Sequence, residues 1–224
     1  MLPALAGAYR SLSARRPPED GPPPAAEAEE EAGLRLGAVS GIAELVREPG
    51  PSQPLAIAVL LEALRDPADE VRAVASDGLG GLGSRAPNVV EVLRRSLQDP
   101  NADFRQAAAR TLSILGSEVP KATGALLEGI RDPRDEVRSL CAKILQEFGG
   151  DPAVVVPALA RILGEGPGPA RALAAETLGF YAHTAEPAIP HLTRLLDDGD
   201  RLAREAAAAA LEKIRKAAGN PNGE

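Results

Sequence analysis

Three glycines have a spacing that could support nucleotide chemistry. Gly78, Gly80 and Gly83 form a GxGxxG pattern, which binds a pyrophosphate when it connects a strand to the start of a helix. No strand pattern precedes these glycines, and they fall inside a helical segment that recurs along the chain. The sequence therefore predicts that this pattern belongs to a helix and does not bind a nucleotide.

The two histidines and the single cysteine lack the partners that catalysis or metal binding would need. His183 and His191 have no Cys, Asp or Glu at the spacing of a zinc ligand set. Cys141 occupies a position that is alanine in equivalent segments, which favours a small buried side chain over an activated thiol. We therefore expect a protein that is not an enzyme, with no catalytic residue, no metal and no cofactor.

The composition argues against several classes of partner. The 224 residues include 32 acidic and 25 basic ones, giving a net charge of −7, which disfavours nucleic-acid backbones and anionic lipids as ligands. There is no Trp, and two Tyr and three Phe provide little surface for stacking bases. No apolar stretch approaches the ~20 residues that a membrane-spanning helix needs. We expect a cytoplasmic protein that contacts neither nucleic acid nor membranes.

The dominant regularity of the chain is a repeat of 33 residues. In each copy an acid is followed six residues later by an arginine, and apolar residues recur at helical spacing on both sides of the acid. Each copy therefore predicts a first helix, a corner at the acid, and a second helix. The acid and arginine pairs are Asp66 and Arg72, Asp99 and Arg105, Asp132 and Arg138, Glu165 and Arg171, and Asp198 and Arg204.

This regularity predicts an all-α fold of about five helix pairs and one additional helix. The segment LRLGAVSGIAELV from Leu34 aligns with the second helix of the next copy, which places Arg35 opposite Arg72 and predicts a solitary capping helix. The last helix is rich in charged residues, which gives the opposite end of the array the polar outer surface that it needs. The expected pairs are 54–65 with 69–82, 87–98 with 102–115, 119–131 with 135–148, 152–164 with 168–182, and 186–196 with 200–217.

The composition divides the chain into three parts. Residues 1–32 are predicted to be a disordered leader, because they become Pro-rich and then wholly acidic and offer little to bury. Within the leader, residues 1–18 contain three arginines and no acid, a weak similarity to an organelle targeting segment. Residues 33–218 are predicted to form the repeat domain, and residues 219–224 a disordered tail.

The corner segments carry a resemblance to a known family. DPADEVRAVASDGLGGLG, DPNADFRQAAARTLSILG and DPRDEVRSLCAKILQEFG resemble HEAT repeats of the short bacterial type also called PBS-lyase-like, over roughly residues 34–217. The resemblance implies a right-handed α–α superhelix, an armadillo-type solenoid that binds proteins along a concave face. It also implies that the acid and arginine columns form a structural ladder joining successive repeats. The fourth copy, GEGPGPARALAAETLGFYA, lacks the Asp-Pro corner, and a local bend is expected there.

The surface predicted to be concave consists of positions seven, eleven and fourteen residues after each acid. These residues are small or of mixed charge, with Arg110 and Lys143 in the centre and acids toward both ends, a pattern that could orient a charged partner. The predicted binding residues are Asp77, Gln106, Arg110, Ser113, Ser139, Lys143, Gln146 and Glu176.

Three functional hypotheses follow from the sequence. The first is a non-enzymatic scaffold or adaptor that binds a protein or peptide in its concave face. The second is an accessory subunit similar to the HEAT-type phycobilin lyases, which attach a tetrapyrrole to a carrier protein; a shift in visible absorbance on mixing with a bilin would distinguish it. The third is a structural module whose functional end lies between Tyr9 and Glu31.

Overall fold

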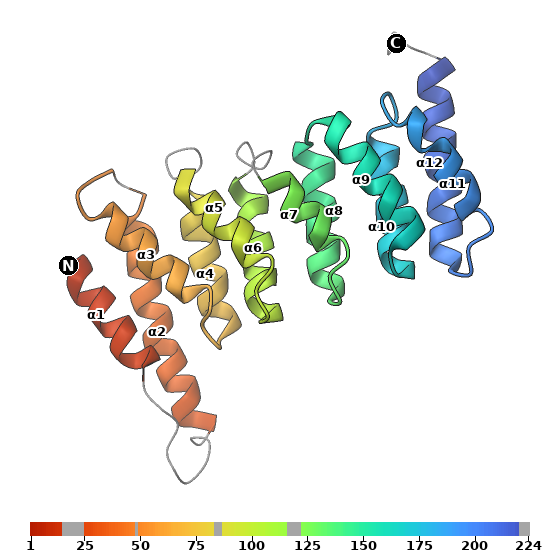
Figure 1. Cartoon of the computed structure of the whole chain (residues 1–224). Helices are drawn as coiled ribbons and strands as arrows, with labels where there is room; N and C mark the ends of the chain where they lie inside the picture. The colour runs from red at the N-terminus through yellow and green to blue at the C-terminus, as the bar shows by residue number, and fades with distance from the viewer. Residues whose placement is uncertain (15–24, 48, 83–86, 116–121, 220–224) are drawn as a thin grey trace.

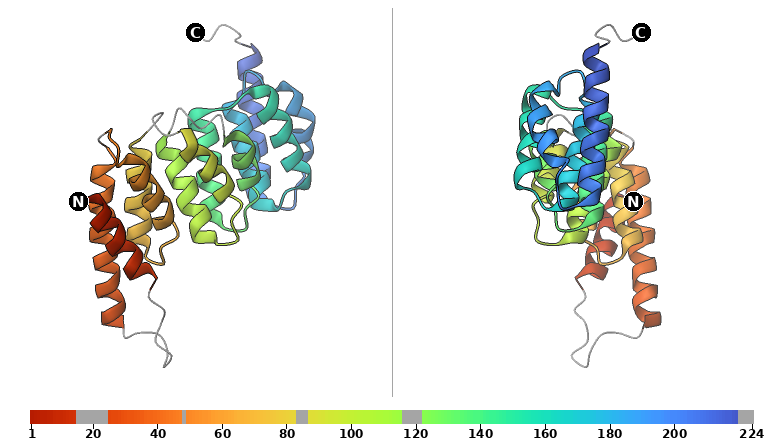
Figure 2. Two further views of the ribbon diagram at one scale, coloured as in Figure 1. Left: turned by 60° about the vertical axis from the view of Figure 1, so that its left-hand side comes forward. Right: turned by 90° about the vertical axis from the view of Figure 1, so that its right-hand side faces the viewer.

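The computed structural model describes residues 1–14, 25–47, 49–82, 87–115 and 122–219. Within these ranges it contains α-helices, one short 3₁₀ turn and their connections, and no strand. Figure 1 shows that the helices stack side by side into an elongated array with the two chain termini at opposite ends. Figure 2 shows the same array turned, with successive helices alternating between two layers. The predicted all-α solenoid is confirmed.

Each repeat contributes one helix to each layer. Most consecutive first helices contact one another along one layer, and all consecutive second helices contact one another along the other. The first helices are α1 (Leu2–Ser13), α3 (Gln53–Ala63), α5 (Pro87–Ser96), α7 (Thr123–Gly129), α9 (Pro152–Glu165) and α11 (Ile189–Leu195). The second helices are α2 (Ala25–Leu45), α4 (Asp69–Gly80), α6 (Ala102–Leu115), α8 (Asp135–Phe148), α10 (Gly168–Phe180) and α12 (Arg201–Gly219).

An aliphatic core runs between the layers, as the repeat predicts. A small side chain nine residues after each acid lets neighbouring helices approach closely, and a leucine four residues later fills the space between them. All of these side chains are buried. They are Ala75, Ala108, Cys141, Ala174 and Ala207, followed by Leu79, Leu112, Leu145, Leu178 and Leu211.

The N-terminal region differs from the disordered leader predicted for residues 1–32. Helix α1 packs against α2 and α3 and buries Leu2, Ala6 and Tyr9, which lie on one helical face. Helix α2 begins at Ala25, so the acidic residues before Leu34 extend a helix. The expected solitary capping helix is therefore the second member of a sixth pair. Residues 15–24, and 220–224 of the predicted tail, lie outside the described residues.

Tyr9 connects α1 to the first corner of the array. Its hydroxyl donates a hydrogen bond to Oδ2 of Asp66 at 3.3 Å, and burial raises the pKa of Tyr9 to about 12. We expect Tyr9→Phe to lower the free energy of unfolding by about 0.5–1.5 kcal/mol, because a buried carboxylate loses one donor while the ring is kept. Urea unfolding followed by circular dichroism checks this. An unchanged midpoint would show that the hydroxyl contributes nothing to the docking of α1.

No helix in the described part of the chain combines the length and the apolar character that crossing a membrane requires.

Candidate binding face and the corner ladder

The acid at each corner shapes the turn between the two helices. At four corners its Oδ1 accepts a hydrogen bond from the backbone N–H two residues later, which forms an Asx turn. This turn ends the first helix and sets the direction in which the second helix begins. The fourth copy cannot form this turn, because the residue two positions after Glu165 is Pro167, which has no N–H. The four pairs are Asp66 with Ala68, Asp99 with Asn101, Asp132 with Arg134, and Asp198 with Asp200, at 2.8–3.0 Å.

The arginine six residues after each acid secures the corner of its own repeat. In all five copies the guanidinium Nη1 donates to a corner carbonyl, which satisfies oxygens that the end of the first helix leaves without a partner. These bonds run from Arg72 to Asp66 at 2.6 Å, Arg105 to Asp99 at 2.8 Å, Arg138 to Asp132 at 2.7 Å, Arg171 to Gly166 at 2.7 Å, and Arg204 to Asp198 at 2.6 Å.

Ladder contacts between repeats exist at three junctions. Arg35 donates to both carboxylate oxygens of Asp66 at 2.9 and 3.2 Å, and Arg105 donates to both oxygens of Asp132 at 2.6 and 3.0 Å. Arg171 donates to Asp198 at 2.6 Å. These arginines lie in the second helices of one repeat and reach the acid of the next.

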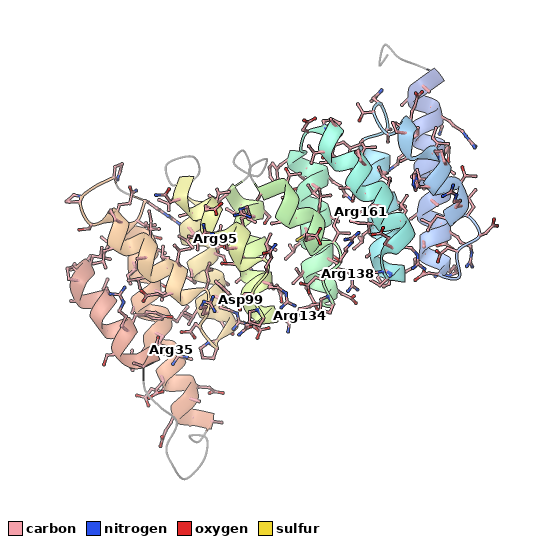
Figure 3. The ribbon with its side chains drawn as sticks, in the orientation of Figure 1. Arg35, Arg95, Asp99, Arg134, Arg138 and Arg161 are labelled. Atoms are coloured by element: carbon pink, nitrogen blue, oxygen red, sulfur yellow. The ribbon has the colours of Figure 1, made fainter. Side chains whose placement is uncertain are left out.

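The other two junctions depart from the predicted ladder. Arg72 pairs with Asp69 and Arg138 pairs with Asp135, each within its own helix. The acids that they would have reached pair with other arginines. Asp99 accepts from Nη2 of Arg65 at 2.6 Å, and Glu165 lies 3.6 Å from Nη2 of Arg131. Figure 3 shows Arg35, Asp99, Arg134 and Arg138 in a row along the edge of the array that holds the corners.

The ladder is expected to make the fold less stable as the pH falls into the acid range. The hydrogen bond from Arg171 holds the pKa of Asp198 below its ordinary value. A carboxylate with a lowered folded pKa stabilises the fold above its unfolded pKa of about 3.9, and this contribution is lost as the pH falls through the folded value. We expect the urea midpoint to fall more steeply below about pH 4 in the wild type than in Asp198→Asn. Parallel curves for the two proteins would contradict this, and Glu176→Gln, an exposed change on α10, is the control.

Grooves lie between neighbouring second helices, on a surface that we call the second-helix face. One groove, between α2 and α4, has a volume of about 420 Å³, and one at α4, α6 and the start of α8 has about 560 Å³. A third, between α6 and α8, has about 480 Å³. The third is lined by Gln106, Arg110, Glu136, Ser139, Leu140 and Lys143.

Five of the eight predicted binding residues line these grooves: Asp77, Gln106, Arg110, Ser139 and Lys143.

The other three predicted binding residues line none of the three. Ser113 donates to the carbonyl of Arg110 at 2.7 Å, and Glu176 is exposed on α10. Gln146 donates to Oγ1 of Thr177 at 3.2 Å and so connects α8 to α10.

Charged residues that the repeat pattern did not single out line the corner end of the grooves. Glu70, Asp103 and Glu136 each lie four residues after the corner acid, and this shared position is the signal that could have identified them. Arg134 pairs with Asp103 and also donates to Oε1 of Gln106 at 3.1 Å. Within the described residues, Glu70 and Glu136 are exposed and have no ion-pair partner.

Cys141 and Gly78, two of the residues considered for chemistry, have structural roles. Burial raises the pKa of the Cys141 thiol to about 12, as expected of an inert side chain. Gly78 and Gly80 form the last turn of α4, and Gly83 lies outside the described residues. A Cβ on Gly78 would come within 2.8 Å of Cβ of Ala43, so this glycine allows α2 and α4 to pack closely. Among the described residues, no group of His, Cys, Asp and Glu could hold a metal ion.

Comparisons with known proteins agree with this architecture. The family model described as HEAT repeats matches residues 57–146 and 123–212. No curated protein matches the chain.

Several solved structures share the fold. The archaeal HEAT-like repeats protein from Thermococcus onnurineus NA1 is 18% identical with a TM-score of 0.54, over 88% of this chain and 82% of that one. A designed armadillo repeat protein in complex with the peptide (KR)4 is 17% identical with a TM-score of 0.51, over 94% and 99%. Cex1p is 14% identical with a TM-score of 0.59, over 97% of this chain and 45% of Cex1p. Since the HEAT-repeat model matches more than half of the sequence and the helix pairs stack as such repeats do, the chain belongs to the HEAT-repeat family.

Proposed function

We propose that the protein is a non-enzymatic scaffold that binds a peptide or a protein segment along its second-helix face. The observation that carries this proposal is the groove between α6 and α8, which is bordered by charged side chains without firm internal partners. The designed armadillo protein of similar fold is in complex with a peptide, which supports the same use of stacked helices.

The groove cations are free to exchange partners at low cost. Arg110 lies 3.9 Å from Asp77, and Lys143 lies 3.7 Å from Glu147. The side chains of Arg110 and Lys143 are 51% and 66% exposed, and ion pairs of this kind contribute about 0–1 kcal/mol. A ligand carboxylate can therefore replace these contacts without a large loss of stability.

Selection from a random peptide library displayed on phage tests the proposal. We expect selected peptides to bind the wild type at least about tenfold more tightly than the variant Arg110→Glu, Lys143→Glu, because the charge at the groove is reversed. The matched control is Arg95→Glu, Arg161→Glu, which makes the same charge change on the first-helix layer (Figure 3). Equal affinity for all three proteins would place binding elsewhere and overturn the proposal.

The structure bears on only one of the two remaining hypotheses. The similarity to phycobilin lyases stays a prediction, and the bilin absorbance measurement remains its test. The hypothesis of a functional end between Tyr9 and Glu31 loses part of its basis, because Tyr9 is buried against Asp66 within the helical array.

A further inference from the structure

We infer that the groove between α6 and α8 binds an extended peptide segment that carries one acidic and one basic residue about three positions apart. This inference rests on the proposed function and names the chemistry of the ligand. It is carried by the charges at the two ends of the groove, the distance between them, and the side chains that lie in between.

One end of the groove is cationic. Arg110 on α6 and Lys143 on α8 occupy equivalent positions in consecutive repeats, eleven residues after the corner acid. Two like charges on neighbouring helices repel each other, and their existing acid partners, at 3.9 and 3.7 Å, are solvent-exposed. A ligand carboxylate placed between them gains from both cations.

The opposite end of the groove is anionic. Glu136 lies in the first turn of α8, and no described residue forms an ion pair with it. It precedes Lys143 by seven residues on the same helix, which corresponds to ~10 Å at 1.5 Å per residue. An extended peptide covers this distance in about three residues at ~3.3 Å each. A basic ligand residue at Glu136 therefore lies about three positions from an acidic one at Lys143.

The middle of the groove suits a peptide backbone with one apolar side chain. Oε1 of Gln106 accepts a hydrogen bond from Arg134, which leaves the amide donors of Gln106 for a ligand carbonyl. The exposed Ser139 offers a hydroxyl that both donates and accepts. Leu140 is half-buried beside them and provides an apolar contact for the residue between the two charges.

The adjacent groove at α4 is less suited to such a ligand. Two of its three cations, Arg72 and Arg134, are engaged by Asp69 and Asp103, and Arg72 also bonds to corner carbonyls. The third, Arg110, also lines the groove between α6 and α8. Glu70 remains without an ion-pair partner there, at the position equivalent to Glu136. Glu70 therefore provides a matched control for Glu136.

Fluorescence anisotropy with labelled synthetic peptides is the first test. The probes contain Asp-Leu-Ala-Lys or Lys-Leu-Ala-Asp between Gly-Ser flanks, since the groove fixes the charge spacing and not the chain direction. The comparison peptide, Leu-Asp-Lys-Ala, has the same composition with adjacent charges. We expect at least one spaced peptide to bind about tenfold more tightly than the comparison peptide. Equal binding of all three would overturn the inference.

A charge swap is the second test. We expect Glu136→Lys to weaken binding of the spaced peptide by about tenfold. Replacing the lysine of that peptide with glutamate should restore its affinity for the Glu136→Lys variant. Glu70→Lys should leave both affinities unchanged. Equal effects of the two variants, or no rescue, would sink the inference. If library peptides depend on Arg110 and Lys143 but lack the spaced charges, the proposed function stands and the ligand chemistry inferred here is wrong.

Discussion

Replacing Arg105 with alanine is expected to lower the free energy of unfolding by about 3–5 kcal/mol, the usual cost of removing one partner of a buried ion pair. The side chains of Arg105 and Asp132 are 11% and 6% exposed, and two hydrogen bonds join them. The substitution also removes the donor to the corner carbonyls of Asp99 and Pro100. Urea unfolding at neutral pH measures the change.

Arg138→Ala is the matched comparison for this prediction. Arg138 makes the same bonds to its own corner, but its carboxylate partner Asp135 is 81% exposed and lies in the same helix. We expect a smaller loss of about 1–3 kcal/mol, which reflects carbonyls left without a donor. If the two substitutions cost the same, the contact between repeats at Asp132 contributes nothing beyond the corner itself.

Adding one methyl group at Gly129 is the second large effect that we expect. Gly129 ends α7, and a Cβ there would overlap Sγ of Cys141, which is fully buried on α8. Overfilling a packed core usually costs about 1–3 kcal/mol. We therefore expect Gly129→Ala to lower the thermal midpoint, although alanine favours a helix more than glycine does.

Cys141→Ala should remove this penalty. In the double variant Gly129→Ala, Cys141→Ala, the methyl group occupies the space of the sulfur, so the thermal midpoint should recover toward that of Cys141→Ala alone. The double-mutant cycle measures the coupling between the two positions. Additive effects would show that the two side chains do not compete for the same space.

The 33-residue spacing was sufficient to predict the five helix pairs from α3 onward, because one residue column fixes each structural role. It could not predict which arginine pairs with which acid. That choice depends on Arg65 and Arg131, one residue before a corner acid, and on Asp69 and Asp135, three residues after one. Arg65 and Arg131 are 66 residues apart, as are Asp69 and Asp135, which is twice the repeat length. A pattern defined over a single repeat of 33 residues does not contain this longer spacing.

The N-terminal helix is not apparent from the composition of residues 1–32, because the Pro-rich and acidic part of this segment dominates its average. Leu2, Ala6 and Tyr9 have helical spacing, and what they pack against is visible only in the assembled array.

The four predicted binding residues that lie eleven residues after an acid, Asp77, Arg110, Lys143 and Glu176, are all exposed. Positions fourteen residues after the acid are more enclosed, because the second helices approach closely near their ends. Gly80 packs against Ile114, and Gly179 against α12.

The alternation of junctions gives the array a period that its helices alone do not reveal. Arginine contacts join α2 to the Asp66 corner, α6 to the Asp132 corner and α10 to the Asp198 corner, so they clamp the repeats two at a time. The first two contacts are buried and the third is partly buried. At the intervening junctions Arg72 and Arg138 pair within their own helices, and the acids Asp99 and Glu165 pair instead with Arg65 and Arg131. Under mechanical tension, the chain should therefore lengthen in steps of about two repeats, each step releasing one clamped pair as a cooperative block.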